Sequence, residues 1–103
     1  MNEPRIEVTA DGSIAVVGEL NHQTVPALLK SSADAMAEAR DTQSDVINID
    51  LNNVSRSDSA GVALLIEWIR QAQKNNKTIQ FHNIPKQMRD IATVTGVDKM
   101  LAI

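Results

Sequence analysis

The residues best placed to do chemistry are the stretch Asp58-Ser59-Ala60-Gly61. It stands between an apolar run, residues 46–51, and a long amphipathic run that follows it. This order predicts a strand, a turn and the start of a helix. Ser59 suits the helix N-cap, because its hydroxyl can accept a hydrogen bond from a free N–H of the first turn. The positive end of a helix also tolerates an added phosphate. The residue types leave open whether Asp58 and Ser59 only cap the helix or also serve a function.

Other chemistries fit the sequence poorly. A serine hydrolase needs a Gly-x-Ser-x-Gly elbow and a histidine in reach, but Ser57 stands where the first glycine should be. His22 and His82 are isolated, whereas a metal site needs clustered ligands. No phosphate-binding Walker loop is present, so we expect no ATP hydrolysis. The sequence therefore predicts no catalytic residue, no cofactor and no metal ligand.

Composition narrows the class of partner. The chain has 103 residues, 43% of them hydrophobic, which suits one compact domain spanning 1–103. Aromatic residues make up 2% and the net charge is −3, so a nucleic-acid partner is disfavoured. There is no cysteine and no evident signal peptide, which fits a cytoplasmic protein. Glu67 and Arg70 break the central apolar run, so we expect no direct membrane insertion.

The periodicity predicts strands alternating with helices. Strands are expected at residues 6–10, 13–18, 46–51 and 78–82, with a hairpin turn at Asp11-Gly12. Helices are expected after Thr24, from Ser59, and after Pro85. This order predicts an α/β fold in which helices flank a mostly parallel sheet that begins with an antiparallel hairpin. Residues 46–51 are apolar at nearly every position, which predicts a strand covered on both faces. Asn48 within it should need a hydrogen-bond partner.

The helical wheel divides the run after Ser59 into two sides. Glu67 and Arg70 point to solvent, and Leu64 and Trp68 fall on the border. That position fits either packing under a neighbouring element or a partly exposed apolar patch that anchors a partner. The expected core residues are Val62, Leu65, Ile66, Ile69 and Ala72.

The last helix is expected to end at Gly96. Its expected apolar side is Met88, Ile91, Ala92 and Val94. An apolar tail that should pack on the body follows, made of Val97, Met100, Leu101 and Ile103.

Residues 46–51, Val54 and Asp58-Ser59-Ala60-Gly61 together resemble the central signature of the STAS domain. Gly18-Glu19-Leu20-Asn21 is similar to the Gly-Glu-Leu-Asp element before the first helix of many STAS domains, with Asn in place of Asp. The resemblance implies a STAS fold. In anti-sigma factor antagonists of this family the serine after the Asp is phosphorylated, and that serine corresponds to Ser59.

Residues 56–68, 81–85 and 92–97 resemble, in more detail, the small STAS subunit of Mla phospholipid-transport systems. That resemblance implies a cytoplasmic, non-catalytic subunit, peripheral to the inner membrane, that binds an ABC-transporter ATPase subunit (MlaF-like). The complex would include a permease and an MCE-domain protein and would maintain outer-membrane lipid asymmetry. The alternative is an anti-sigma factor antagonist switched by phosphorylation at Ser59. The expected partner-binding residues are Arg56, Asp58, Ser59, Ala60, Leu64, Glu67 and Trp68.

Overall fold

The computed structural model describes residues 4–9, 13–40 and 45–101, so the predicted turn at Asp11-Gly12 lies outside the described residues. Strands and helices follow one another in the predicted order, with one short helix added at the end. The elements are β1 (Arg5–Val8), β2 (Ile14–Leu20), α1 (Val25–Arg40), β3 (Val46–Ser57), α2 (Ser59–Lys74), β4 (Thr78–His82), α3 (Lys86–Thr95) and α4 (Asp98–Leu101).

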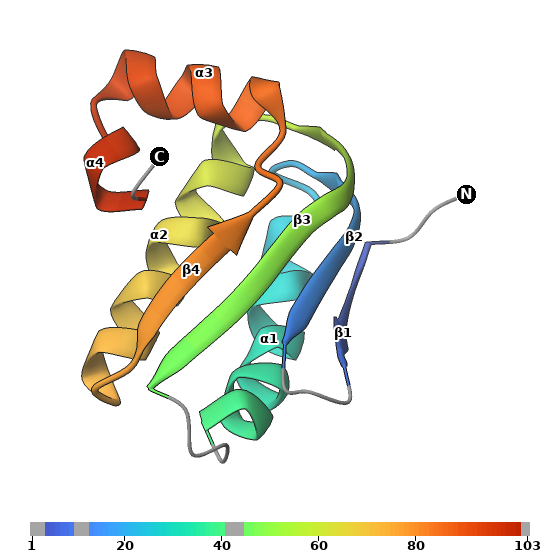
Figure 1. Cartoon of the computed structure of the whole chain (residues 1–103). Coiled ribbons are helices and arrows are strands. Elements are labelled where there is room, and N and C mark those ends of the chain that lie inside the picture. Colours follow the sequence, from blue (N-terminus) through green and yellow to red (C-terminus); the bar gives the residue numbers. More distant parts are fainter. Residues whose placement is uncertain (1–3, 10–12, 41–44, 102–103) are drawn as a thin grey trace.

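The four strands form one mixed sheet in the order β1-β2-β3-β4. β1 pairs antiparallel with β2, and the pairs β2–β3 and β3–β4 are parallel. Figure 1 shows α1 and α2 together on one face of this sheet, with α3 across the end where β3 and β4 finish. The predicted α/β fold is therefore confirmed, including the leading hairpin and the mostly parallel sheet.

Helices cover only one face of β3, so the prediction that both faces are covered is wrong. Ile47 and Ile49 are buried toward α1 and α2, whereas Asn48 and Asp50 point to the other face and are half-exposed. That open face is polar, and its side chains bond to one another. Asn48 finds the partner it was predicted to need, because its Oδ1 lies 2.9 Å from Nε2 of His82.

β3 is longer than the sequence suggests. It runs to Ser57, so the polar residues after Leu51 belong to a strand and not to a turn. The register with β2 shifts at two places, which adds extra residues to β3 as bulges do. As a result Leu51, Val54 and Ser57 all face the core at a spacing of three. Because bulges interrupt the alternation of buried and exposed residues, a search for strict alternation does not detect the full length of such a strand.

The buried side of α2 is rotated from the predicted one. Leu64 is 0% exposed and Trp68 is 1% exposed, so both belong to the core. Ile66 and Ile69, expected to be buried, are only partly so. The fully buried positions follow i, i+3, i+4, i+7 and i+11 from Gly61, which is the stripe of a helix lying on a sheet. They are Gly61, Leu64, Leu65, Trp68 and Ala72, with Val62 beside them.

The C-terminal segment packs through fewer residues than predicted. Gly96 ends α3 with φ 80°, as expected of a helix C-cap, and the N–H of Val97 donates to the carbonyl of Ala92. Met88, Ala92 and Leu101 are buried. The placement of Val94 and Met100 on the buried side is wrong, because their exposed fractions are 86% and 54%. α3 lies across the sheet end (Figure 1), and Met88 and Ala92 are its buried residues.

Candidate functional site

The junction between β3 and α2 is capped by Asp58. Its Oδ1 accepts a hydrogen bond from the N–H of Ala60 at 2.8 Å, and its own N–H donates to the carbonyl of Leu20 at 3.1 Å. The cap predicted at Ser59 is therefore one residue too late. Since β3 continues to Ser57, Asp58 alone separates the strand from the helix.

Ser59 is exposed in the first turn of α2, and within the described residues its hydroxyl forms no hydrogen bond. Arg56 and Asp58 are also exposed, and Ala60 is half-buried. The structure thus brings Arg56, Asp58, Ser59 and Ala60 together at one surface, which we call the junction surface. Its serine is exposed and is not the helix cap, because that role belongs to Asp58.

A depression of about 380 Å³ lies beside the junction. Arg56 and Asp58 line it together with Glu19 from the end of β2 and Gln87 from α3. Oδ1 of Asn21 accepts hydrogen bonds from the N–H groups of Gln23 and Thr24 at 2.8 and 3.0 Å. Asn21 therefore stabilises the turn between β2 and α1.

Charges of both signs meet in this depression. The Asn21 side-chain amide donates to a carboxylate oxygen of Glu19 at 2.8 Å, which fixes that carboxylate. Arg56 forms no ion pair within the described part of the chain. An unpaired cation beside two carboxylates, those of Glu19 and Asp58, suits a polar interface rim more than an anion pocket.

Two of the predicted partner-binding residues do not lie on the exposed surface. Trp68 is buried, and its indole N–H has no hydrogen-bond partner among the described residues. The interpretation of Leu64 and Trp68 as a partly exposed patch is therefore wrong, and the alternative, packing under neighbouring elements, holds.

Leu64 nevertheless lines a groove between α1 and α2. The groove has a volume of about 440 Å³, and Val25, Leu29 and Ala63 also line it. Glu67 stands at its edge, within 3.9 Å of Arg70. The groove has apolar walls and a polar edge, so it could accept an apolar side chain.

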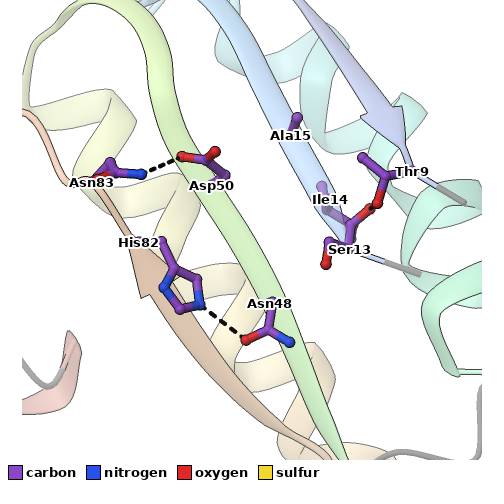
Figure 2. Close-up of a pocket in the computed structure, with 8 residues that line it drawn as sticks. All are labelled: Thr9, Ser13, Ile14, Ala15, Asn48, Asp50, His82 and Asn83. Atoms are coloured by element: carbon purple, nitrogen blue, oxygen red, sulfur yellow. Dashed lines mark hydrogen bonds between the residues drawn. The ribbon is translucent and has the colours of Figure 1, made fainter. Parts of the chain in front are cut away.

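A second depression, of about 720 Å³, lies on the open face of the sheet (Figure 2). Asp50 accepts a hydrogen bond from the side-chain amide of Asn83 at 3.1 Å and another from the N–H of Asn52 at 2.9 Å. The hydrogen bond from Asn83 is the largest cause that lowers the pKa of Asp50, followed by the hydrogen bond from Asn52. Burial opposes them, and the nearby charge of His82 lowers the pKa by the smallest amount. Asp50 is therefore a carboxylate at neutral pH.

His82 is bonded to Asn48 and not to Asp50, so these groups form no acid–base pair. Sequence reasoning missed this cluster. The available signal was polar residues at alternate positions of β3, opposite the end of β4. Within the described residues no group of three or more potential ligands could hold a metal ion. No helix in the same ranges is long and apolar enough to cross a bilayer.

Comparison with known proteins identifies the family of this chain. A family model described as "Mlab, STAS domain" matches residues 7–102. The intermembrane phospholipid transport system binding protein MlaB of Haemophilus influenzae is 27% identical over 90 residues, which cover 87% of this chain and 85% of that protein. The structure of the anti-sigma factor antagonist SpoIIAA in its unphosphorylated form superposes with a TM-score of 0.67 at 17% identity, covering 97% of each chain. That level of identity supports the fold alone. The chain belongs to the STAS domain family and is most like its MlaB members.

Proposed function

We propose that this chain is a non-catalytic subunit that binds the ATPase subunit of an ABC-type phospholipid transporter through the junction surface. The observation that carries the proposal is the exposed, unbonded hydroxyl of Ser59 at the start of α2, in a chain similar to MlaB. The full assembly would also hold a permease and an MCE-domain protein, would keep this subunit at the cytoplasmic side of the inner membrane, and would maintain outer-membrane lipid asymmetry.

The shape of the surface supports docking rather than catalysis. Arg56, Asp58 and Glu67 supply charged groups of both signs, which favour correct orientation of a partner more than raw affinity. Ala60 is small and lets another backbone approach the first turn of α2. The groove between α1 and α2 opens next to this turn and could receive an apolar side chain. In this proposal Leu64 and Trp68 do not contact the partner. Their packing in the core holds α2 in position.

Phosphorylation of Ser59 would weaken binding of the ATPase subunit. The N-terminus of α2 favours an anion there, so the fold would survive. The phosphate would add about −1.5 to −2 charge next to Asp58. A closely packed partner could not hydrate that charge, so binding would weaken.

Co-purification with the ATPase subunit of the same organism tests the proposal. Ser59→Asp should weaken the complex while leaving the melting temperature of the chain nearly unchanged. Ser59→Thr should bind the ATPase subunit like the parent. Thr78→Asp is the matched control, because it adds the same charge at an exposed position at the far end of the sheet. If the parent chain shows no binding, or if Ser59→Asp binds like Thr78→Asp, the proposal is wrong.

Activity assays test the non-catalytic part separately. ATPase and esterase assays on the purified chain should stay at background. Turnover that disappears in Ser59→Ala would contradict this part of the proposal.

An anti-sigma factor antagonist remains the second candidate, because an exposed serine at this junction serves that function equally well. The similarity to MlaB over most of the chain favours the transporter subunit. Incubation with an anti-sigma kinase and ATP separates the two. Stoichiometric phosphorylation at Ser59, with no binding to the transporter ATPase, would favour the antagonist.

A further inference from the structure

One side of α3 leaves the apolar side chain of Val94 largely exposed, next to Ile91, which packs in part against the core. Gln87, Ile91 and Val94 recur at i, i+4 and i+7, so they lie along one side of the helix. Val94 has an exposed fraction of 86%, and among the described large hydrophobic residues only Met100 is also classed as exposed. Ile91 is half-buried. We call Gln87, Ile91 and Val94 the α3 stripe.

The α3 stripe begins at the junction surface. Oε1 of Gln87 accepts a hydrogen bond from the N–H of Ser57 at 3.3 Å, and Ser57 directly precedes the capping residue Asp58. Gln87 also lines the depression beside Arg56 and Asp58. α3 packs against both α2 and β3 and crosses the sheet end where the junction lies (Figure 1). The stripe and the junction therefore form one continuous surface.

The junction surface is too small and too polar to hold a partner alone. A stable protein–protein interface of standard size takes about 20–30 residues from each side. Its centre is usually apolar and well packed, with charged groups at the rim. Arg56, Asp58 and Ser59 have the character of a rim. A stable complex must therefore extend from the junction to neighbouring surfaces with apolar groups. The groove between α1 and α2 is one such surface, and α3 offers another.

We propose that the α3 stripe is an apolar part of the surface that docks the ATPase subunit, a proposal that rests on the function proposed above. Ile91 and Val94, with Asp90 and Thr95, line a depression of about 230 Å³ that could seat one aliphatic or aromatic side chain of that subunit. Lys86 and Asp90 form an ion pair of 2.9 Å at its margin, which supplies a polar edge. Docking would bury Val94 and extend the contact from Ser59 along α3.

The test compares Val94→Asp with Thr93→Asp in binding to the purified ATPase subunit. Both positions are exposed in the last turn of α3, so both variants bear the same penalty from a negative charge near a helix C-terminus. They point about 100° apart around the helix. Val94→Asp should weaken binding by about tenfold or more, which is the effect of a residue at the centre of an interface. Thr93→Asp should stay within about twofold of the parent.

A milder variant guards against a folding artefact. Val94→Thr keeps the shape of the side chain and should weaken binding measurably with an unchanged melting temperature. Equal effects of Val94→Asp and Thr93→Asp on binding would overturn the proposal that the α3 stripe docks the ATPase subunit. So would parent-like binding by Val94→Asp while Ser59→Asp binds poorly, a result that leaves the proposed function standing. If the parent does not bind the ATPase at all, the proposed function itself fails.

The free chain provides one more readout. Sedimentation of the parent and of Val94→Asp shows whether the stripe instead joins two copies of this chain. A dimer of the parent that Val94→Asp abolishes would assign the stripe to self-association and overturn the proposal.

Discussion

Gly61, in the first turn of α2, lies directly against the side chain of Ser57 at the end of β3. A Cβ placed on Gly61 would overlap Oγ of Ser57 and would come within 3.0 Å of Cβ of Leu20. The backbone of Gly61 is helical, so the glycine is needed for close approach and not for an unusual φ. The short distance between strand end and helix start, which sets the place of Ser59, depends on this contact.

Gly61→Ala should therefore destabilise the fold, although alanine is the better helix former by about 1 kcal/mol. We expect a net loss of about 1–3 kcal/mol, as for overpacked cores, measured by denaturant unfolding. Adding Ser57→Ala should recover part of the loss, because it removes the oxygen nearest to the new methyl group. A neutral Gly61→Ala would show that the junction is less tightly packed than described.

Gly96→Ala is the matched comparison. Gly96 has φ 80° and open space around its Cβ position, so its substitution meets a backbone penalty and no clash. The expected loss is about 1 kcal/mol. No second-site change at a neighbouring side chain should rescue it, in contrast to Gly61→Ala.

Substitutions of Asp58 and Ser59 should show which of the two residues caps α2. Asp58→Ala removes the hydrogen bond to Ala60 and should cost about 1 kcal/mol, whereas Asp58→Asn can keep it. Ser59→Ala should change stability by only a few tenths of a kcal/mol, since its hydroxyl is free within the described residues. Thermal melts of the three variants check this order. A larger loss of stability in Ser59→Ala than in Asp58→Ala would show that Ser59 is the N-cap of α2.

The core of α2 offers a graded test. Leu65 is 0% exposed and its truncation to Ala should cost about 2–5 kcal/mol. Ile69→Ala should cost less, because Ile69 is only partly buried. Trp68→Ala should cost about 3–5 kcal/mol, so any loss of partner binding in that variant would reflect unfolding. A Trp68→Ala chain with parent-like stability in urea would contradict its burial.

The open face should respond to acid through Asp50. Because its pKa is lowered in the folded state, ionised Asp50 contributes stability that is present above the unfolded pKa of about 3.9. That stability is lost as the pH falls through the folded pKa. Asn83→Gly removes the main cause and still tolerates the φ of 58° at this position. In this variant the pKa of Asp50 should rise toward its ordinary value, as followed by NMR titration; an unchanged pKa would mean that Asn83 is not its cause.

The sequence predicts the order of elements well because each one carries a local signal. The alternation in residues 78–82 and the glycine after Thr95 mark β4 and the end of α3 at the residues where the structure has them. The start of α2 is also correct, although the cap is not. Asp58 and Ser59 are both good capping residues, and only the length of β3 decides between them.

The wrong predictions concern features that depend on tertiary contacts. Leu64, Trp68, Ile66 and Ile69 are all apolar, so two rotations of α2 satisfy its pattern equally well. The packing of α2 on the sheet, beside α1, selects the rotation that buries Trp68. Val94 is exposed although it is apolar, because its exposure depends on how α3 packs on the rest of the fold, which no pattern within α3 encodes.

β3 joins the two halves of the sheet, and its partners change along its length. β4 pairs with it up to Asp50 and β2 pairs with it from Ile49, so the two pairings overlap only there. Beyond that point, alternate backbone amides face a side with no strand. Two backbone amides in this part of β3 donate to side chains instead of to a strand. The N–H of Asn52 donates to the carboxylate of Asp50, and the N–H of Ser57 donates to the side-chain carbonyl of Gln87. In hydrogen–deuterium exchange, amides near Ile49 should exchange only on global unfolding, and that of Ser57 through a smaller local opening. The end of β3 that leads into Asp58 and Ser59 is thus the part whose exchange a partner bound at the junction surface would slow most.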